Sequence, residues 1–128
     1  ICDTGHNVGG IKYIVEQLSF QTYKQLHIVM GMVNDKDIRS VLAMLPKEAT
    51  YYFTKASVKR ALPEDQLQQL ANQISLKGNT YSDVQSAVKA AYTNADKDDL
   101  IFVGGSSFIV ADLLSFYVNN ETIAIQNR

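Results

Sequence analysis

Short apolar runs alternate along this chain with segments whose apolar residues recur every three or four positions. The clearest run, HIVMGMV at 27–33, predicts a strand that is buried on both faces. The runs at 50–53 (TYYF) and 100–103 (LIFV) predict two more strands, because β-branched and aromatic residues favour extended backbone. Residues 1–2 resemble the end of an earlier strand, and 80–81 predict a very short one.

Helical periodicity fills the intervals between these strands. Each interval carries an apolar stripe that predicts one buried helix face. The stripes are Val8, Ile11, Ile14, Val15 and Leu18; Ile38, Val41, Leu42 and Leu45; Leu67, Leu70, Ala71 and Ile74; Val84, Ala87, Val88 and Ala91; and Ile109, Val110, Leu113 and Leu114.

A few residues predict where these helices begin and end. Pro46 is expected to stop the second helix, because proline lacks the N–H that would continue it. Pro63 is expected at the first position of the third helix, and Gly78 is expected to close it. Ser82, with Gln85 three residues later, predicts a capping box at the start of the fourth helix.

Together these elements predict an α/β fold. Strand and helix alternate about five times, which is typical of a three-layer, Rossmann-like domain with a mostly parallel sheet and helices on both faces. The length of 128 residues suits one hydrophobic core, so residues 1–128 are expected to form a single domain. The apolar fraction of 46% and the net charge of −1 exclude a disordered chain and give no support to nucleic-acid binding.

Composition also bears on the surroundings of the chain. No run approaches the roughly 20 apolar residues that a membrane-spanning helix needs, so no membrane partner is expected. Cys2 is the only cysteine and is interpreted as a small buried residue; without an internal disulfide, a reducing, cytoplasmic location is expected. The chain opens on Ile1, inside an apparent strand end, which suggests a fragment of a longer protein. In the tail at 119–128, residues 122–125 could add an edge strand or stay loose.

Polar residues gather where strands pass into helices. In a parallel sheet these turns lie at the carboxyl ends of the strands, where such folds bind ligands. The turns at 3–7 (DTGHN) and 104–107 (GGSS) offer side chains and helix-start N–H groups to a carboxylate or phosphate. Each turn taken alone is equally typical of an ordinary helix cap.

Other candidates are weaker. The segment 31–37 (GMVNDKD) suits either a nucleotide cleft or plain turn chemistry. Lys55, Lys59 and Arg60 form a basic cluster that is expected to be solvated, although Arg60 could reach a phosphate or a neighbouring domain. His27 is interpreted as a structural residue at an edge, not as a ligand.

No complete catalytic or metal-binding set is apparent. No combination of His, Cys, Asp and Glu has convincing metal-ligand spacing. A hydrolytic pair of Ser106 and His6 lacks the GxSxG elbow that would present the nucleophile. The chain is therefore expected to hold no catalytic residue and no metal of its own.

Four segments in register resemble one known family. Residues 3–7 resemble the D-x-x-H-N motif that opens the C-terminal domain of the folylpolyglutamate synthase/dihydrofolate synthase family. Residues 31–38 resemble its G-x-x-x-D-K-D stretch, 60–62 its R-A-L, and 105–112 its G-S-x-Y-x-x-G-E helix start. The departures are Val8 in place of a common proline, and Phe108, Ala111 and Asp112 in place of tyrosine, glycine and glutamate.

The resemblance implies an ATP-dependent amide ligase. ATP would phosphorylate a folate or dihydropteroate carboxylate, the amine of L-glutamate would attack the acyl phosphate, and phosphate would leave. A preceding ATP-binding domain of the same protein, with a P-loop and Mg²⁺ ligands, would supply most of this chemistry. ATP and Mg²⁺ are then expected in the full-length enzyme, and the isolated chain is expected to be inactive.

The same resemblance implies three kinds of contact. They are contacts with glutamate from His6 and Ser106, with the nucleotide from Asp3 and Asn7, and with a phosphate or the domain interface from Lys36 and Arg60.

Alternatives from the same and other classes stay open. Peptidoglycan Mur ligases share this architecture, so the chain could be the C-terminal domain of a cell-wall ligase. A non-catalytic, Rossmann-like nucleotide-binding module would fit the strand pattern but lacks the GxGxxG fingerprint. A receiver-type signalling module would need an aspartate at the end of the third strand, where the chain has Thr54 and Lys55.

Overall fold

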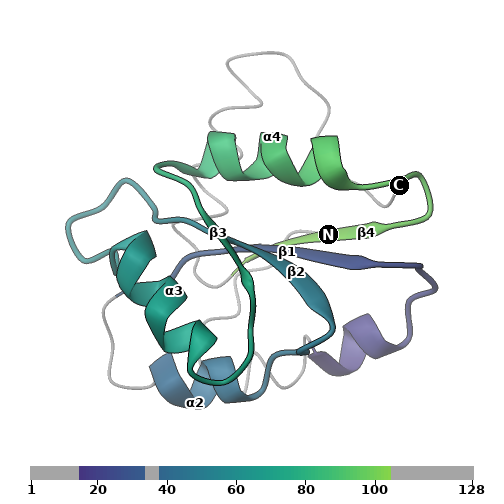
Figure 1. Ribbon diagram of the computed structural model, residues 1–128, viewed down its shortest axis with the longest axis horizontal. Helices are drawn as coiled ribbons and strands as arrows, with labels where there is room; N and C mark the ends of the chain where they lie inside the picture. The colour runs from purple at the N-terminus through teal and green to yellow at the C-terminus, as the bar shows by residue number, and fades with distance from the viewer. Residues whose placement is uncertain (1–14, 34–37, 105–128) are drawn as a thin grey trace.

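Four parallel strands form a single sheet in the computed structural model, which describes residues 15–33 and 38–104. The strands lie in the order β3-β2-β1-β4 (Figure 1). In chain order the elements are β1 (Leu26–Met30), α2 (Ile38–Ala43), β2 (Ala49–Phe53), α3 (Glu64–Asn72), β3 (Gly78–Thr80), α4 (Val84–Asn94) and β4 (Leu100–Gly104). Residues 15–19 are also helical. The predicted α/β class and the parallel sheet are confirmed.

Helices cover both faces of this sheet and create two cores. Figure 1 shows α4 above the sheet, with α2, α3 and the helical turn at 15–19 below it. The larger core, below the sheet, includes Ile28, Leu42 and Leu67. The smaller core, beneath α4, includes Val29 and Val88. The predicted three layers are therefore present.

Strand β1 lies at the centre of both cores. All five of its residues are buried, as the continuous apolar run predicts. Leu26, Ile28 and Met30 enter the larger core, whereas Val29 enters the smaller one. This alternation follows from the two-residue period of a strand, which sends successive side chains to opposite faces.

The predicted helix faces are largely confirmed. The stripes of α2 and α4 are fully buried, as is Leu45 just beyond α2, and α2 ends before Pro46. In α3, Leu67 and Ala71 are buried, while Leu70 and Ile74 are partly buried against the larger core. Predictions for residues 1–14, 34–37 and 105–128 lie outside the described residues. Within the described ranges, no helix combines the length and apolar character needed to cross a bilayer.

Strand β1 ends at Met30, three residues before the predicted end at Val33. The backbone of the next residues pairs elsewhere. The Leu62 N–H donates to the Met32 carbonyl at 2.7 Å, and Val33 forms an isolated antiparallel bridge with Ala61. Residues 31–33 are buried although they lie outside the sheet, and Met32 belongs to the larger core.

Gly78 does not close α3, which was the prediction. The helix ends at Asn72, and Gly78 opens β3, so this strand is Gly78–Thr80 and not 80–81. A Cβ atom at Gly78 would overlap the carbonyl group of Tyr51. The missing side chain therefore permits close approach of β3 to β2.

Two helix starts also differ from prediction by one residue. Asp83, not Ser82, caps α4, and its carboxylate accepts a hydrogen bond from the Ser86 N–H at 2.7 Å. Pro63 occupies the N-cap of α3 and Glu64 is the first helical residue. In both cases the element was predicted correctly and its terminal residue was not.

Candidate functional site

The strand order creates a switch point between β1 and β4. From β1 the chain passes through α2 to β2 on one side, whereas β4 is added on the other side. The two strands are paired to their carboxyl ends, where Met30 lies opposite Gly104. In open parallel sheets, ligands bind outside the carboxyl ends of the strands at such a reversal. This edge is therefore the candidate ligand-binding site.

Apart from Arg60, the predicted site residues lie outside the described part of the chain, although two of them follow the strands of this edge in sequence. Gly104 precedes the turn that contains Ser106, and Val33 precedes the segment that contains Lys36. The described structure does not include these two residues, nor Asp3, His6 and Asn7. The expected meeting of His6 with Ser106 stays a prediction.

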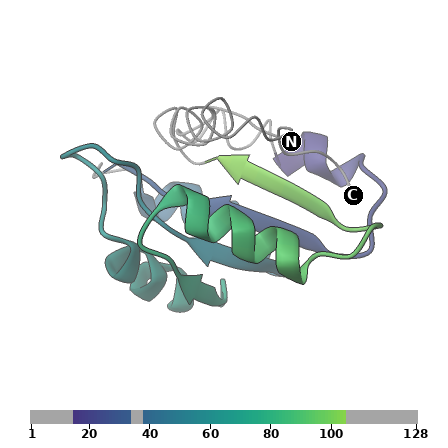
Figure 2. The same cartoon turned by 90° about the horizontal axis from the view of Figure 1, so that it is seen from above.

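Arg60 is the predicted site residue that the structure describes. It lies in the loop 54–63 that joins β2 to α3, which we call the basic loop, together with Lys55 and Lys59. All three side chains are exposed, as predicted. Figure 2 shows this loop extending past the arrowheads of the strands, on the same edge as the switch point.

Backbone and apolar contacts hold the basic loop in place. Ala56 is buried in the smaller core and Leu62 in the larger one, so the loop is anchored on both faces of the sheet. The Ala61 N–H donates to the Val58 carbonyl at 3.1 Å, which closes a turn within the loop. The loop also borders a pocket of about 520 Å³ that is lined by Lys55, Ala56, Ser57, Val58, Lys59, Ala61 and Pro63.

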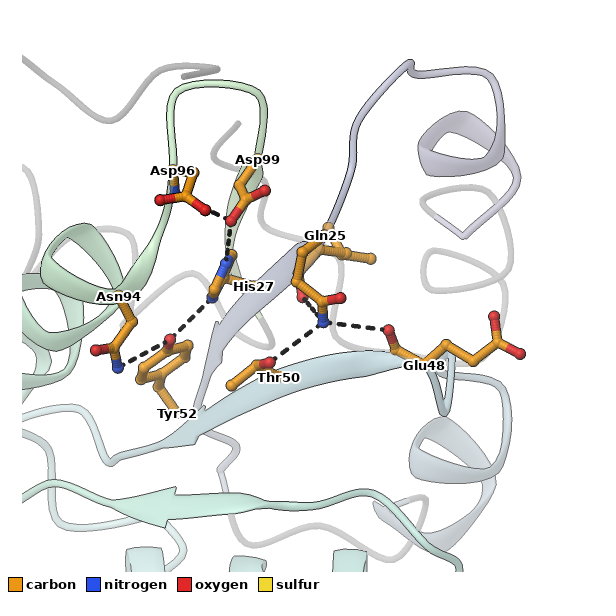
Figure 3. Close-up of polar contacts among 9 residues, drawn as sticks. Gln25, His27, Glu48, Thr50, Tyr52, Asn94, Asp96 and Asp99 are labelled. Atoms are coloured by element: carbon orange, nitrogen blue, oxygen red, sulfur yellow. Dashed lines mark hydrogen bonds and ion pairs between the residues drawn. The ribbon is translucent and has the colours of Figure 1, made fainter.

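A buried polar cluster occupies the opposite, amino-terminal edge of the sheet (Figure 3). We call it the amino-edge network. His27 Nε2 lies 2.9 Å from Asp99 Oδ2, and His27 Nδ1 lies 2.8 Å from the Tyr52 hydroxyl. The Asp96 N–H donates to the same Asp99 oxygen at 3.0 Å, and the Asn94 amide donates to the Tyr52 hydroxyl at 3.4 Å. The network joins β1 and β2 to the turn before β4.

The hydrogen-bond donors and acceptors of this network can be assigned without conflict. With Nε2–H donating to the Asp99 carboxylate and the Tyr52 hydroxyl donating to Nδ1, no ring nitrogen of His27 lacks a partner. The Asp96 N–H is the main cause that lowers the pKa of Asp99, and His27 lowers it further, against the effect of burial. Burial raises the pKa of Tyr52. These closed contacts fit the structural interpretation of His27, which lies at the start of an interior strand.

No local pattern in the sequence identifies the partners of His27. Asp99 is 72 residues away in the chain, and Tyr52 is one of several aromatic residues in a run that predicts only a strand. Among the described residues, no three His, Cys, Asp or Glu side chains come together as a possible metal site.

Comparison with known proteins identifies the family. The sequence pattern of the family described as "Mur ligase, glutamate ligase domain" matches residues 1–107. The chain is 28% identical over 113 residues to a probable bifunctional folylpolyglutamate synthase/dihydropteroate synthase of Haloferax volcanii. It is 30% identical over 118 residues to a dihydrofolate synthase/folylpolyglutamate synthase of Buchnera aphidicola.

These matches cover most of this chain but a small part of the relatives. The shares are 88% of this chain and 14% of the Haloferax protein, and 90% of this chain and 28% of the Buchnera protein. A crystal structure of a bifunctional folylpolyglutamate synthase/dihydrofolate synthase with Mn, AMPPNP and L-glutamate bound superposes with a TM-score of 0.79 at 27% identity. That match covers 94% of this chain and 28% of the solved one.

The resemblance that four sequence segments carry is thus confirmed by the family pattern, by the relatives and by the fold. This chain belongs to the Mur ligase family as a glutamate ligase domain, and its relatives are folylpolyglutamate synthases.

Proposed function

We propose that this chain is the C-terminal domain of an ATP-dependent ligase that joins L-glutamate to the carboxylate of a folate or dihydropteroate. The observation that carries the proposal is the switch point between β1 and β4, from which two of the family-like segments continue. The relatives, which are named as folylpolyglutamate synthases, support the substrate class, and the solved structure with AMPPNP and L-glutamate supports the pair of co-substrates.

The reaction has two steps. The γ-phosphate of ATP is transferred to an oxygen of the folate carboxylate, which gives an acyl phosphate and ADP. The amine nitrogen of L-glutamate then attacks the acyl carbon, the carbon–oxygen bond to phosphate breaks, and the amine loses a proton. An amide and inorganic phosphate result. Because two substrates must meet, holding the amine near the acyl carbon contributes much of the rate.

We assign the residues of this domain to positioning. His6 and Ser106 hold the carboxylates of the incoming glutamate, because donors at the starts of the helices predicted there would suit an anion. Asp3 and Asn7 face the nucleotide, and Lys36 and Arg60 contact a phosphate or the neighbouring domain. Closure of the preceding domain over this edge assembles the site and excludes water.

ATP enters as a substrate and Mg²⁺ as its counter-ion. The described residues contain no group of three potential metal ligands. As the family resemblance implies, we assign the Mg²⁺ ligands and the phosphate-binding loop to a preceding ATP-binding domain, in line with the short share of each relative that this chain covers.

The test is steady-state kinetics of the full-length protein. ADP release is expected only when L-glutamate and a folate or dihydropteroate are both present. His6→Ala and Ser106→Ala should each raise the KM for glutamate by ~10-fold or more, because each removes a hydrogen bond to a charged group. The neighbouring Ser107→Ala serves as the control.

Two results would contradict this proposal. A larger rise in the KM for ATP than for glutamate would remove the assigned role of His6 and Ser106. ADP release that requires a peptidoglycan precursor instead of a folate would identify a cell-wall ligase, and nucleotide binding without any turnover would identify a non-catalytic module.

A further inference from the structure

The basic loop carries three positive charges, and the proposed function assigns a role to only one of them, Arg60. Its sequence TKASVKRALP contains Lys55, Lys59 and Arg60 and no acid. Among the residues that the structure describes, no carboxylate lies within ion-pair distance of these three side chains. The nearest acids in sequence, Glu64 and Asp65, belong to the first turn of α3, and Asp65 accepts a hydrogen bond from the Gln66 N–H.

This charge is held on a fixed frame. Ala56 and Leu62 are each only 4% exposed and fasten the two ends of the loop to opposite faces of the sheet. The bridge between Val33 and Ala61 connects the loop to the segment that leaves β1 at the switch point. The backbone that carries the three cations is therefore held at a defined position relative to the candidate site.

The pocket beside the loop combines two kinds of surface. Two lysines, Lys55 and Lys59, line it together with Ser57, and the other lining residues are the apolar Ala56, Val58, Ala61 and Pro63. No aromatic side chain that could stack on a nucleotide base is among the lining residues. This combination suits a flexible chain of methylene groups that bears repeated carboxylates.

The distance to the switch point suits such a chain. Strands β2 and β4 are separated by β1, so their carboxyl ends lie about 10 Å apart at the usual strand spacing. About three residues of extended peptide span this distance, and side-chain linkage through the γ-carboxyl spans it with fewer. A ligand that reacts at the switch point can therefore reach the basic loop with its neighbouring residues.

We propose that the basic loop binds the free carboxylates of an existing glutamate tail on the folate substrate, through Lys55, Lys59 and Arg60. This inference rests on the proposed function, because it assumes that the acceptor is a folate that already carries glutamate. For Arg60 it adds a carboxylate partner to the contact with a phosphate or the neighbouring domain that is proposed above.

The first test compares acceptors of different tail length in the full-length enzyme. In Lys55→Gln/Lys59→Gln, the ratio of the KM for a tetraglutamate folate to the KM for a monoglutamate folate should rise ~5-fold, as expected for two exposed ion pairs. Lys47→Gln/Lys77→Gln is the matched control. It removes the same charge from exposed lysines that precede β2 and β3 at the opposite edge, and the ratio should stay unchanged.

Three results would overturn the inference. They are an equal change for both acceptors, a rise in the KM for ATP alone, and an equal effect of the control pair. The second of these would assign the loop to the phosphates of the nucleotide.

The second test separates this inference from the proposed function. A fluorescent tetra-γ-glutamate peptide is titrated with full-length protein, and anisotropy reports binding without any turnover. The wild-type protein and the control pair should bind it ~5-fold more tightly than Lys55→Gln/Lys59→Gln, and the difference should shrink as salt is added. Binding without ligase activity would contradict the proposed function alone. Ligase activity with equal peptide binding by all three proteins would contradict the tail site alone.

Discussion

Thr50 and Thr54, within and just after β2, differ in whether their hydroxyl groups form a hydrogen bond. Thr54, just after β2, is fully buried and its Oγ1 has no hydrogen-bond partner. Thr50, within β2, has an Oγ1 that accepts from the Gln25 side-chain amide at 3.2 Å. A buried hydroxyl without a partner costs stability, whereas a paired one does not.

Valine substitutions at these positions should therefore act in opposite directions. Thr54→Val is expected to raise the free energy of unfolding by about 1 kcal/mol, because it removes an unpaired polar group and keeps the shape of the side chain. Thr50→Val should lower it by about 0.5 kcal/mol, because the Gln25 amide loses an acceptor. Urea unfolding monitored by circular dichroism measures both. Destabilisation by Thr54→Val would mean that its hydroxyl has a partner in solution.

Asp99 should make stability depend on acidity. Its pKa in the folded state lies below the ordinary value, chiefly because the Asp96 N–H donates to the carboxylate. The carboxylate therefore stabilises the fold above about pH 4, and this contribution is lost as the pH falls through the lowered pKa. In Asp99→Asn the free energy of unfolding should fall by about 2 kcal/mol at neutral pH and show a shallower loss in acid.

The neighbouring Asp98→Asn is the control for this prediction. Asp98 is exposed, and only its backbone carbonyl takes part in a described contact, with the Lys24 N–H. Its acid profile should match that of the wild type. Equal profiles for Asp98→Asn and Asp99→Asn would show that the amino-edge network contributes nothing to acid stability.

The amino-edge network also marks what the sequence could not predict at this scale. A single histidine at the start of an apolar run allows several interpretations, and the buried carboxylate that decides between them lies 72 residues away. Such a pair is created by the parallel pairing of β1 with β4, which no local spacing encodes.

At the scale of elements, α4 allows a direct comparison between two candidate caps. Asp83→Ala should lower the free energy of unfolding by about 1 kcal/mol, because the Ser86 N–H loses its acceptor and the helix start loses a negative charge. Ser82→Ala should change it by no more than a few tenths. Thermal unfolding of both variants checks the assignment. A larger loss of stability in Ser82→Ala than in Asp83→Ala would mean that Ser82 caps the helix, as the capping box predicts.

Element identity was predictable where one periodicity dominated a segment. The stripe of α4 and the run at β4 each match a single template, and both elements form as predicted. Their ends were less predictable, because competing local signals differ little in energy. Residues 31–33 are buried and apolar but lie outside the sheet. Their backbone pairs instead with Ala61 and Leu62, which are about 30 residues away in the chain.

At the scale of the whole molecule, the strand order decides where ligands can bind. The alternation of strands and helices predicts a parallel sheet, but it does not say that β4 is added beside β1 and not beside β3. The switch point depends on that choice. The turn predicted at 104–107 follows β4 in sequence at this edge, and the meeting of His6 with Ser106 stays a prediction.

One prediction concerns the chain as a separate molecule. The purified 128-residue chain should show helix and strand in circular dichroism but release no ADP from ATP, with or without glutamate and folate. The reason is that the proposed phosphate-binding loop and Mg²⁺ ligands belong to another domain. ATP turnover by this chain, retained after repeated purification, would contradict that division.

The sheet keeps its two polar rims apart. The amino-edge network and the switch point lie at opposite ends of β1, which at four residue steps are separated by about 13 Å. Substitutions this far apart usually contribute additively to the free energy of unfolding. Substitutions in the proposed substrate-binding groups at one rim should consequently leave the amino-edge network at the other rim intact. The same independence would allow each rim to be engineered separately.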